Sequence, residues 1–313
     1  MRVNLAVACA ILIACRLARV CVMSSFPAVI WCWPGGSRFP PGMRRWRGWC
    51  WSAGWGHRIV TASRTSRLSA STWRTRGIAV LSYDKRGVGS SSGDWLDSTL
   101  DDLAADATAA LGFLCAQPEV RAGTAGLLGH SEGGWVVLRA AAGRDDVPWV
   151  ITSGCPGMTP AAQERHALAG VLRRAGEQDA DSILALFDRL AEAGRRGGDF
   201  AEAARIVSSA RPSRAFRDYW SDRDERLWEF LKRIQDHDPV PDALRLRCPH
   251  LAVFGGADEL VPVADSTRRF SAAASHRIQV GANAGLAPAF SAPWSGGSRP
   301  KPASQAPEHA LRA

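Results

Sequence analysis

The segment Gly126–Leu138, which reads GLLGHSEGGWVVL, constrains the fold more than any other part of this chain. An apolar run ends at a lone serine, Ser131, which has one glycine two residues before it and another two residues after it. Small residues at those positions allow a tight turn from a strand into a helix, and such a turn lifts the hydroxyl clear of the backbone. The helix that follows points its first amides at the same place, where they can stabilise negative charge. The segment therefore predicts a nucleophilic serine.

Short apolar runs alternate with helical patterns around this segment. Strands are expected in residues 78–84, 125–130 and 147–154, and helices in residues 98–117 and 132–143. Short, mostly apolar strands that alternate with helices are typical of a parallel sheet covered on both faces. The expected fold class is therefore α/β, with a mostly parallel sheet and helices on both faces.

The alternation stops in residues 159–237, where apolar residues recur at three-and-four spacing and predict several helices. A long helical insertion between two strands of a sheet is expected to form a cap. The sheet core is expected in residues 77–158 and resumes in residues 238–292. Residues 293–313 are rich in Pro, Ser and Gly, so they are expected to form a disordered tail.

The positive charge of the chain is confined to residues 1–76. The net charge is +9, but this segment holds 12 Arg and no Lys, Asp or Glu, and the remaining residues carry a net charge of −3. It also contains seven of the 13 Trp and five of the eight Cys. One interpretation is a basic, aromatic arm that binds nucleic acid. We favour the other, a GC-rich gene read in a shifted frame, because basic arms usually include Lys and hold less Trp and Cys. Nucleic acid is therefore not expected as a partner.

The first 21 residues have a short basic start and an apolar run in residues 3–15, as a signal peptide would. The run is too short to cross a bilayer comfortably, and Arg16 and Arg19 follow at once. A cytoplasmic location is expected, with export through a signal peptide as the alternative, and no transmembrane span is expected.

Three blocks of the sequence resemble one family. They are YDKRGVGSSSGDW (83–95), GHSEGG (129–134) and FGGADELVPV (254–263), and together they resemble the α/β-hydrolase superfamily, particularly its bacterial esterases and serine-aminopeptidase-like members with a helical cap. The resemblance covers residues 77–263. It implies a serine nucleophile that is followed along the chain by an acid and then by a histidine. It also implies that the turn Asp84–Gly87 is structural.

The acid that the resemblance implies is Asp258. It comes just after the expected strand 250–254. A carboxylate at the carboxyl end of a strand lies at the same edge of the sheet as Ser131, where sheet-based sites form. The alternative is that this acid is a solvated turn residue, for which the neighbouring Glu259 is the natural example.

The histidine is the hardest residue to place, and His276 is the candidate that chain order favours. The resemblance implies a short strand, a loop of small residues and then the histidine, and RRF followed by SAAASHR fits that description. Only 18 positions separate Asp258 from His276, fewer than in the family, and the family's helix before the last strand is not evident in the pattern. An exposed loop histidine is the alternative. The other histidines fit less well by position: His57, His130, His166, His237, His250 and His309.

Two backbone amides are expected to form the oxyanion hole. One belongs to Glu132, directly after the nucleophile. The other is assigned to Gly36, in the PGG segment that follows the apolar run 26–33. The outline of an apolar run and then glycines suits this role, but the segment has the unusual composition of residues 1–76.

These residues support acyl transfer through a covalent intermediate. His276 would take the proton of Ser131, Ser131 would attack a carbonyl, and Asp258 would orient the imidazole. The substrate is expected to be a small-molecule ester or amide, and this mechanism implies no metal or organic cofactor. Cys115, Cys155 and Cys248 also show no metal-binding spacing. The leading hypothesis is an esterase. The alternatives are a short-peptide serine aminopeptidase and a damaged, non-catalytic relative.

Overall fold

The computed structural model describes residues 78–88, 91–118 and 120–272, and it also places the backbone of three short strands, Ile13–Arg16, Val29–Trp31 and Ile278–Asn283. The rest of the expected signal peptide and Arg-rich segment, the tail 293–313, and the candidate residues Gly36 and His276 lie outside the described residues.

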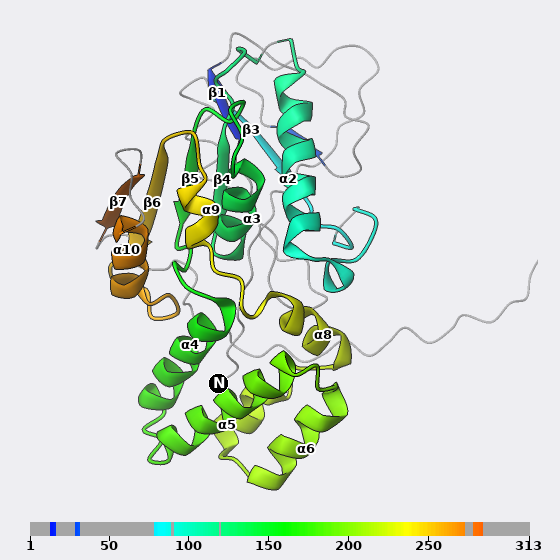
Figure 1. The fold of residues 1–313 in the computed structure, drawn as a ribbon, viewed down its shortest axis with the longest axis vertical. Helices are drawn as coiled ribbons and strands as arrows, with labels where there is room; N and C mark the ends of the chain where they lie inside the picture. The colour runs from blue at the N-terminus through cyan, green and yellow to red at the C-terminus, as the bar shows by residue number, and fades with distance from the viewer. Residues whose placement is uncertain are drawn as a thin grey trace, which may run out of the picture.

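A parallel sheet forms the centre of the described structure (Figure 1). Its strands lie in the order β4-β5-β6-β7. Their bounds are Leu127–His130 for β4, Val150–Ser153 for β5, His250–Gly255 for β6 and Ile278–Asn283 for β7. His130 is in register with Ser153, and Ser153 with Val253. The carboxyl ends of β4, β5 and β6 therefore meet at one edge of the sheet.

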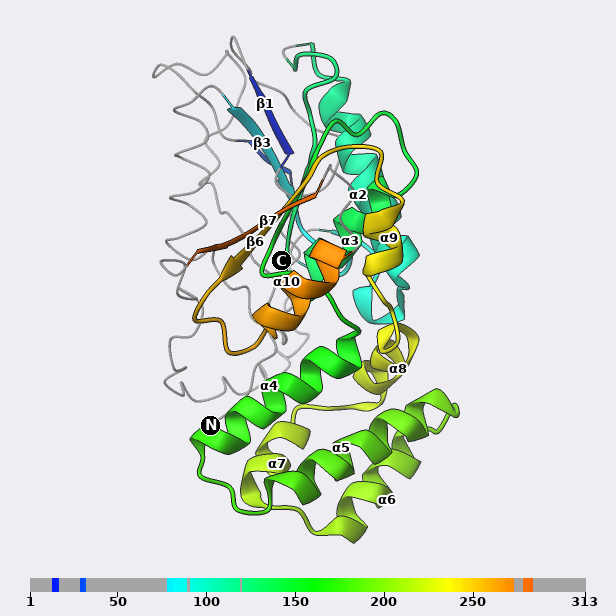
Figure 2. The ribbon, with the colours of Figure 1, turned by 60° about the vertical axis from the view of Figure 1, so that its left-hand side comes forward.

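Helices pack on this sheet, and Figure 2 shows α3, α9 and α10 side by side on one of its faces. Helix α2 packs against α3. The bounds are Leu100–Cys115 for α2, Glu132–Ala141 for α3, Val240–Leu244 for α9 and Val263–Ala272 for α10. The arrangement confirms the expected α/β class with a mostly parallel sheet.

The core between sheet and helices is built from the apolar runs that the sequence shows. Leu127 on β4 and Val150 on β5 are fully buried, as are Val136 and Val137 on α3. Burying one such side chain stabilises the fold by roughly 1.5–3 kcal/mol. Helix α3 is apolar along most of its length because it lies between the sheet and α2.

The strand β3 (Ile78–Tyr83) pairs differently from the other strands. It lies between β1 (Ile13–Arg16) and β2 (Val29–Trp31) and is antiparallel to both. Its apolar pattern predicts a buried strand, which the structure contains. The partners of a strand depend on segments distant in the chain, so the pattern alone could not give this antiparallel pairing.

Five helices follow β5 and precede α9 and β6, and we call Pro160–Ile234 the helical insertion. Its helices are α4 (Pro160–Arg174), α5 (Ala180–Arg195), α6 (Phe200–Ala210), α7 (Arg214–Trp220) and α8 (Glu225–Ile234). It has an apolar cluster of its own, which includes the buried side chains of Leu172, Phe187 and Phe216. Figure 1 shows it beyond one end of the sheet.

Helix α10 corrects one prediction. No helix was expected between the VPVADS segment and the last strand, and RRF was expected as a short strand, but α10 spans Val263–Ala272 and includes RRF. The buried residues of α10 are Ser266 and Phe270, four positions apart, which is the spacing of one helix face. The remaining positions of α10 are mostly polar, so the sequence shows little periodicity there. The last strand, β7, begins at Ile278, after His276 rather than before it.

Candidate active site

Ser131 occupies the turn between β4 and α3 in a backbone conformation that is rare for a non-glycine residue. Its φ is 54° and its ψ is −124°. Its N–H donates to the carbonyl of Ser153 on β5 at 3.0 Å, and its side chain makes no capping hydrogen bond to α3. A conformation of this kind costs on the order of 1–3 kcal/mol and persists only where neighbouring structure enforces it. The turn therefore has the geometry expected for an exposed nucleophile.

Glycines make this turn possible because other parts of the chain approach it closely. A Cβ on Gly129 would lie 2.0 Å from the carbonyl oxygen of Gly133. A Cβ on Gly134 would lie 2.4 Å from both Cβ and Sγ of Cys155, a buried residue. Burial raises the pKa of the Cys155 thiol far above its ordinary value, so this thiol is not a reactive group.

Glu132 begins helix α3, directly after Ser131. Its backbone amide therefore belongs to the first turn of the helix, where amides carry partial positive charge that is not cancelled within the helix. The carbonyl of Ser131 accepts from the Gly134 N–H at 2.8 Å, which fixes the start of this turn. This is the position where one oxyanion donor was expected.

Asp258 lies in the turn between β6 and α10, at the same edge of the sheet. Its Oδ1 accepts from the backbone N–H groups of Leu260 at 2.9 Å and Val261 at 3.1 Å, and the residue is half-buried. Glu259 is different, because its side chain is exposed and pairs with Arg174. Of the two neighbouring acids, Asp258 is the one that the backbone holds in place.

Gly154, directly after β5, lies close to both Asp258 and His130. It has a positive φ of 56°, and its N–H donates to the Val253 carbonyl at 2.8 Å. A Cβ at this position would lie 3.7 Å from Asp258 Oδ2 and 3.4 Å from His130 Cε1. The second carboxylate oxygen of Asp258 and the ring of His130 thus lie around one small residue.

His130, directly before Ser131, is one of the histidines that fit the role of the base less well by their position in the sequence. Burial lowers the pKa of His130, while a hydrogen bond with the Ser153 backbone and the charge of Asp258 raise it, and the balance lies below the ordinary value. The only sequence signal for this proximity was its place next to Ser131. His276, the predicted base, lies outside the described residues. Of the predicted site, the structure describes Ser131, Glu132 and Asp258, at one edge of the sheet.

The other described histidines have structural surroundings. The Nε2 atom of buried His250 lies 2.9 Å from Thr152 Oγ1, between β6 and β5. His237 Nε2 lies 4.0 Å from Asp242 Oδ2. His166 is exposed on α4. None of these positions gives a reason to replace His276 as the predicted base.

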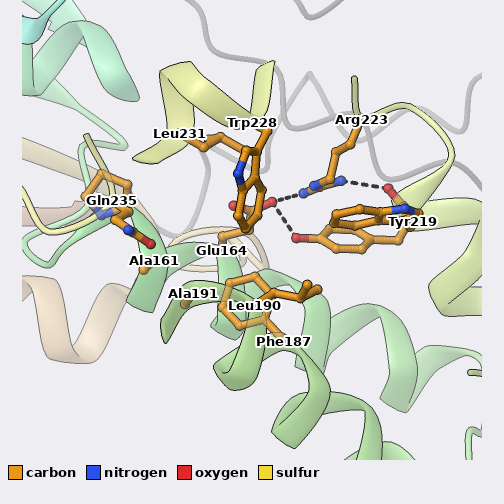
Figure 3. Close-up of a pocket in the computed structure, with 12 residues that line it drawn as sticks. Ala161, Glu164, Phe187, Leu190, Ala191, Tyr219, Arg223, Trp228, Leu231 and Gln235 are labelled. Carbon is orange, nitrogen blue, oxygen red and sulfur yellow. Dashed lines mark hydrogen bonds and ion pairs between the residues drawn. The ribbon is translucent and has the colours of Figure 1, made fainter. Parts of the chain in front are cut away.

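A small cavity lies inside the helical insertion (Figure 3). Glu164 accepts hydrogen bonds there from the Tyr219 hydroxyl and from Arg223, whose guanidinium lies 3.8 Å from the centroid of the Tyr219 ring. The cavity has a volume of about 50 Å³, which is room for one or a few water molecules. Ligand pockets are larger and measure roughly 300–1,000 Å³. Neither Ser131 nor Asp258 lines it, so it is separate from the candidate active site.

In the part of the chain that the structure describes, no group of three or more His, Cys, Asp or Glu side chains is arranged to hold a metal ion. No described helix combines the length and the apolar character needed to cross a membrane.

The fold and the serine turn define a serine hydrolase of the α/β-hydrolase type. The model of the X-Pro dipeptidyl-peptidase (S15) family matches residues 52–293, which is most of the chain. The chain therefore belongs to this family, and its membership confirms the resemblance to the α/β-hydrolase superfamily. No curated protein matches the sequence.

Solved structures of several hydrolases are similar to this chain. The Pyrococcus furiosus esterase PF2001 is 15% identical, with 71% of this chain and 67% of that chain covered and a TM-score of 0.45. MGS-M2, an α/β-hydrolase from a Medee basin deep-sea metagenome library, is 15% identical, with 71% and 77% covered and a TM-score of 0.43. A puromycin-hydrolysing peptidase of Mycobacterium tuberculosis is 20% identical, with 69% and 27% covered and a TM-score of 0.38. At such identities and scores, none of them bears on the substrate.

Proposed function

We propose that this chain hydrolyses small carboxylic esters, with Ser131 as nucleophile, His276 as base and Asp258 as the acid that orients the base. The observation that carries the proposal is the strained turn at Ser131, which lies at the same edge of the sheet as Asp258. Strain of this kind has a cost in stability, and its place at the start of a helix suits a nucleophile.

In the proposed reaction, the Oγ of Ser131 attacks the carbonyl carbon of the ester while His276 takes the hydroxyl proton. The negative charge on the carbonyl oxygen is stabilised by the amides of Glu132 and Gly36. The C–O bond to the alcohol breaks, and His276 returns the proton to the leaving alcohol. Water then attacks the acyl-enzyme in the same way and releases the acid. Asp258 holds one imidazole tautomer throughout.

We also propose that the helical insertion caps this site. It follows β5 directly in the chain, and β5 ends beside the serine turn. The indole N–H of Trp135, on α3, donates to the carbonyl of Pro156 at 2.8 Å, which ties the start of this connection to the nucleophile helix. In enzymes of this architecture, such an element selects the substrate while the catalytic residues supply the chemistry.

The second candidate function is cleavage of short peptides from the amino end, which the family match favours. The two functions are separated by rates on matched substrates: a short-chain nitrophenyl ester against dipeptidyl and aminoacyl nitroanilides. An esterase gives turnover of the ester and little of the anilides. The peptidase alternative predicts turnover of the anilides, whether or not the more reactive ester is also cleaved. A folded chain that turns over none of these substrates would favour the third hypothesis, a relative that has lost catalysis.

A further inference from the structure

Lys85 and Glu132 form a buried ion pair next to the serine turn. Lys85 Nζ donates to Glu132 Oε1 at 2.7 Å, and the two side chains are 4% and 2% exposed. Lys85 belongs to the turn after β3, and Glu132 is the first residue of α3. The bond therefore joins two distant segments of the chain at the residue that follows the nucleophile. The turn at Lys85 was expected to be only structural.

Two aromatic rings cover the ammonium group of this pair. Its nitrogen lies 4.3 Å from the ring centroid of Trp95 and 5.5 Å from that of Phe230, and the two rings meet edge to face at 4.9 Å. Trp95 begins the short helix η1 (Trp95–Asp97), whereas Phe230 comes from α8 of the helical insertion. Aromatic faces attract cations, most strongly where water is excluded. The insertion thus closes over Lys85.

Further contacts fix α8 over this pair. Arg226 donates to the carboxylates of Asp94 at 2.8 Å and Asp97 at 3.0 Å, and Arg233 donates to the backbone carbonyls of Leu96 and Ser98. These bonds link both ends of α8 to η1. The position of Phe230 over the ammonium is therefore determined by the docking of the insertion.

Lys85 holds the Glu132 carboxylate in place through its hydrogen bond to Oε1. The second oxygen of Glu132, Oε2, is buried and has no hydrogen-bond partner among the residues that the structure describes. A buried ion pair is poor evidence for stability, because apolar residues of similar volume are often as stable or more so. A role beyond stability is the better explanation for a buried pair at this position.

We propose that Lys85 is a positioning residue: through the carboxylate of Glu132, it fixes the backbone amide that stabilises the oxyanion formed when Ser131 attacks. This inference rests on the proposed function of Ser131. The N–H of Ser131 is held by Ser153, and the side chain of the next residue is held by Lys85, so the turn is restrained on both sides of the nucleophile. An error of about 1 Å in such a site lowers the rate on the order of 10²-fold.

The test replaces the ion pair by apolar side chains in the full-length chain: Lys85→Met together with Glu132→Met. Both charges are removed, so no uncompensated charge is left buried and the fold is expected to be kept. With a nitrophenyl ester, we expect kcat to fall about 10- to 100-fold and KM to change by less than about threefold. The rate constant for phosphonylation of Ser131 at saturating probe should fall in parallel. The thermal midpoint shows whether the variant is folded.

A matched control is a second, largely buried ion pair among the described residues, that of Arg223 with Glu164 inside the helical insertion, whose side chains are each 11% exposed. Replacing both of these residues by Met also removes a buried pair but leaves Glu132 anchored, so kcat should stay within about twofold of the parent. If the first double variant does not fold, Lys85→Met with Glu132→Gln keeps the shape of residue 132 without a buried charge, and the same fall in kcat is expected.

Each result has one meaning. A folded variant without Lys85 that keeps the kcat of the parent would overturn the positioning role while leaving the proposed function intact. An equal fall in kcat in the Arg223 and Glu164 control would also overturn it, because the loss would then follow from removing any buried pair. A parent chain that neither hydrolyses esters nor reacts with the probe would overturn the proposed function, and this inference with it.

Discussion

The backbone N–H of Ser131 donates to the carbonyl of Ser153 at 3.0 Å, so the turn that carries the candidate nucleophile is bonded to the neighbouring strand. Ser153 is followed by Gly154, which lies beside Asp258 Oδ2. One short connection at the end of β5 thus touches both the serine turn and the candidate acid.

Gly129→Ala should disrupt the serine turn. Its new Cβ would lie 2.0 Å from the carbonyl oxygen of Gly133, so the backbone of the turn would have to move. We expect a loss of about 3 kcal/mol in the free energy of unfolding and loss of ester hydrolysis, both measured on the purified full chain. Gly112→Ala is the control, because that helical glycine of α2 is exposed and has no atoms within 4 Å of the new Cβ. It should stabilise the protein by roughly 0.5–1 kcal/mol. Equal effects of the two substitutions would contradict the close packing of the turn.

Asp258→Asn should lower kcat on the order of 10⁴-fold, because a neutral amide in place of the carboxylate cannot hold the correct imidazole tautomer. The neighbouring Glu259→Gln is the control: its exposed side chain pairs with Arg174 and should change kcat by less than about threefold. The kcat values of the two variants are compared by steady-state kinetics on one ester. A larger loss from Glu259→Gln than from Asp258→Asn would mean that the wrong acid was assigned.

His276→Ala should abolish ester hydrolysis if His276 is the base. His130 provides the comparison, because its ring lies near Asp258 and is bonded to the Ser153 backbone. His130→Gln should keep more than about a tenth of the parent kcat, since residue 130 is expected to support the turn rather than accept the proton. If instead His276→Ala is as active as the parent and His130→Gln is inactive, the base is His130.

His250 should make the protein less stable in mild acid. Burial lowers the pKa of His250 from 6.5 to about 4. Between those values the unfolded chain binds a proton that the folded chain does not, so the free energy of unfolding falls as the pH falls through this range. From about pH 7 to about pH 5, the protonation of this one group should lower the free energy of unfolding by about 2 kcal/mol.

The role of His250 is tested by urea unfolding of the parent and of His250→Gln, each at about pH 7 and at about pH 5. The amide of glutamine can still bond with Thr152 but does not titrate in this range. Between about pH 7 and about pH 5, the free energy of unfolding of the variant should therefore fall by about 2 kcal/mol less than that of the parent. The same acid-dependent loss in both proteins would show that His250 is not its source.

The sequence was sufficient for the features that depend on neighbouring residues. The glycines around Ser131 predicted the turn, and the position of Asp258 after an apolar run predicted its place at the sheet edge. Helix α10 was missed because only Ser266 and Phe270 mark its buried face. The pairing of β3 was missed for a different reason, since its partners are distant in the chain.

The contacts that depend on tertiary structure could not be predicted in the same way. Lys85 and Glu132 are 47 positions apart, and Phe230, whose ring lies near the Lys85 ammonium, comes from α8 of the helical insertion. No local pattern marks such a set, because each of these residues is common in its own setting. The proximity of His130 to Asp258 is of the same kind.

Covalent labelling shows directly whether Ser131 is a nucleophile. The full-length chain is treated with a fluorophosphonate probe, and the adduct is counted by intact mass and located by peptide mapping. We expect one adduct per chain, on Ser131, and none on a folded Ser131→Ala variant. A folded parent chain that takes no label, or an alanine variant that is labelled as fast as the parent, would contradict this expectation.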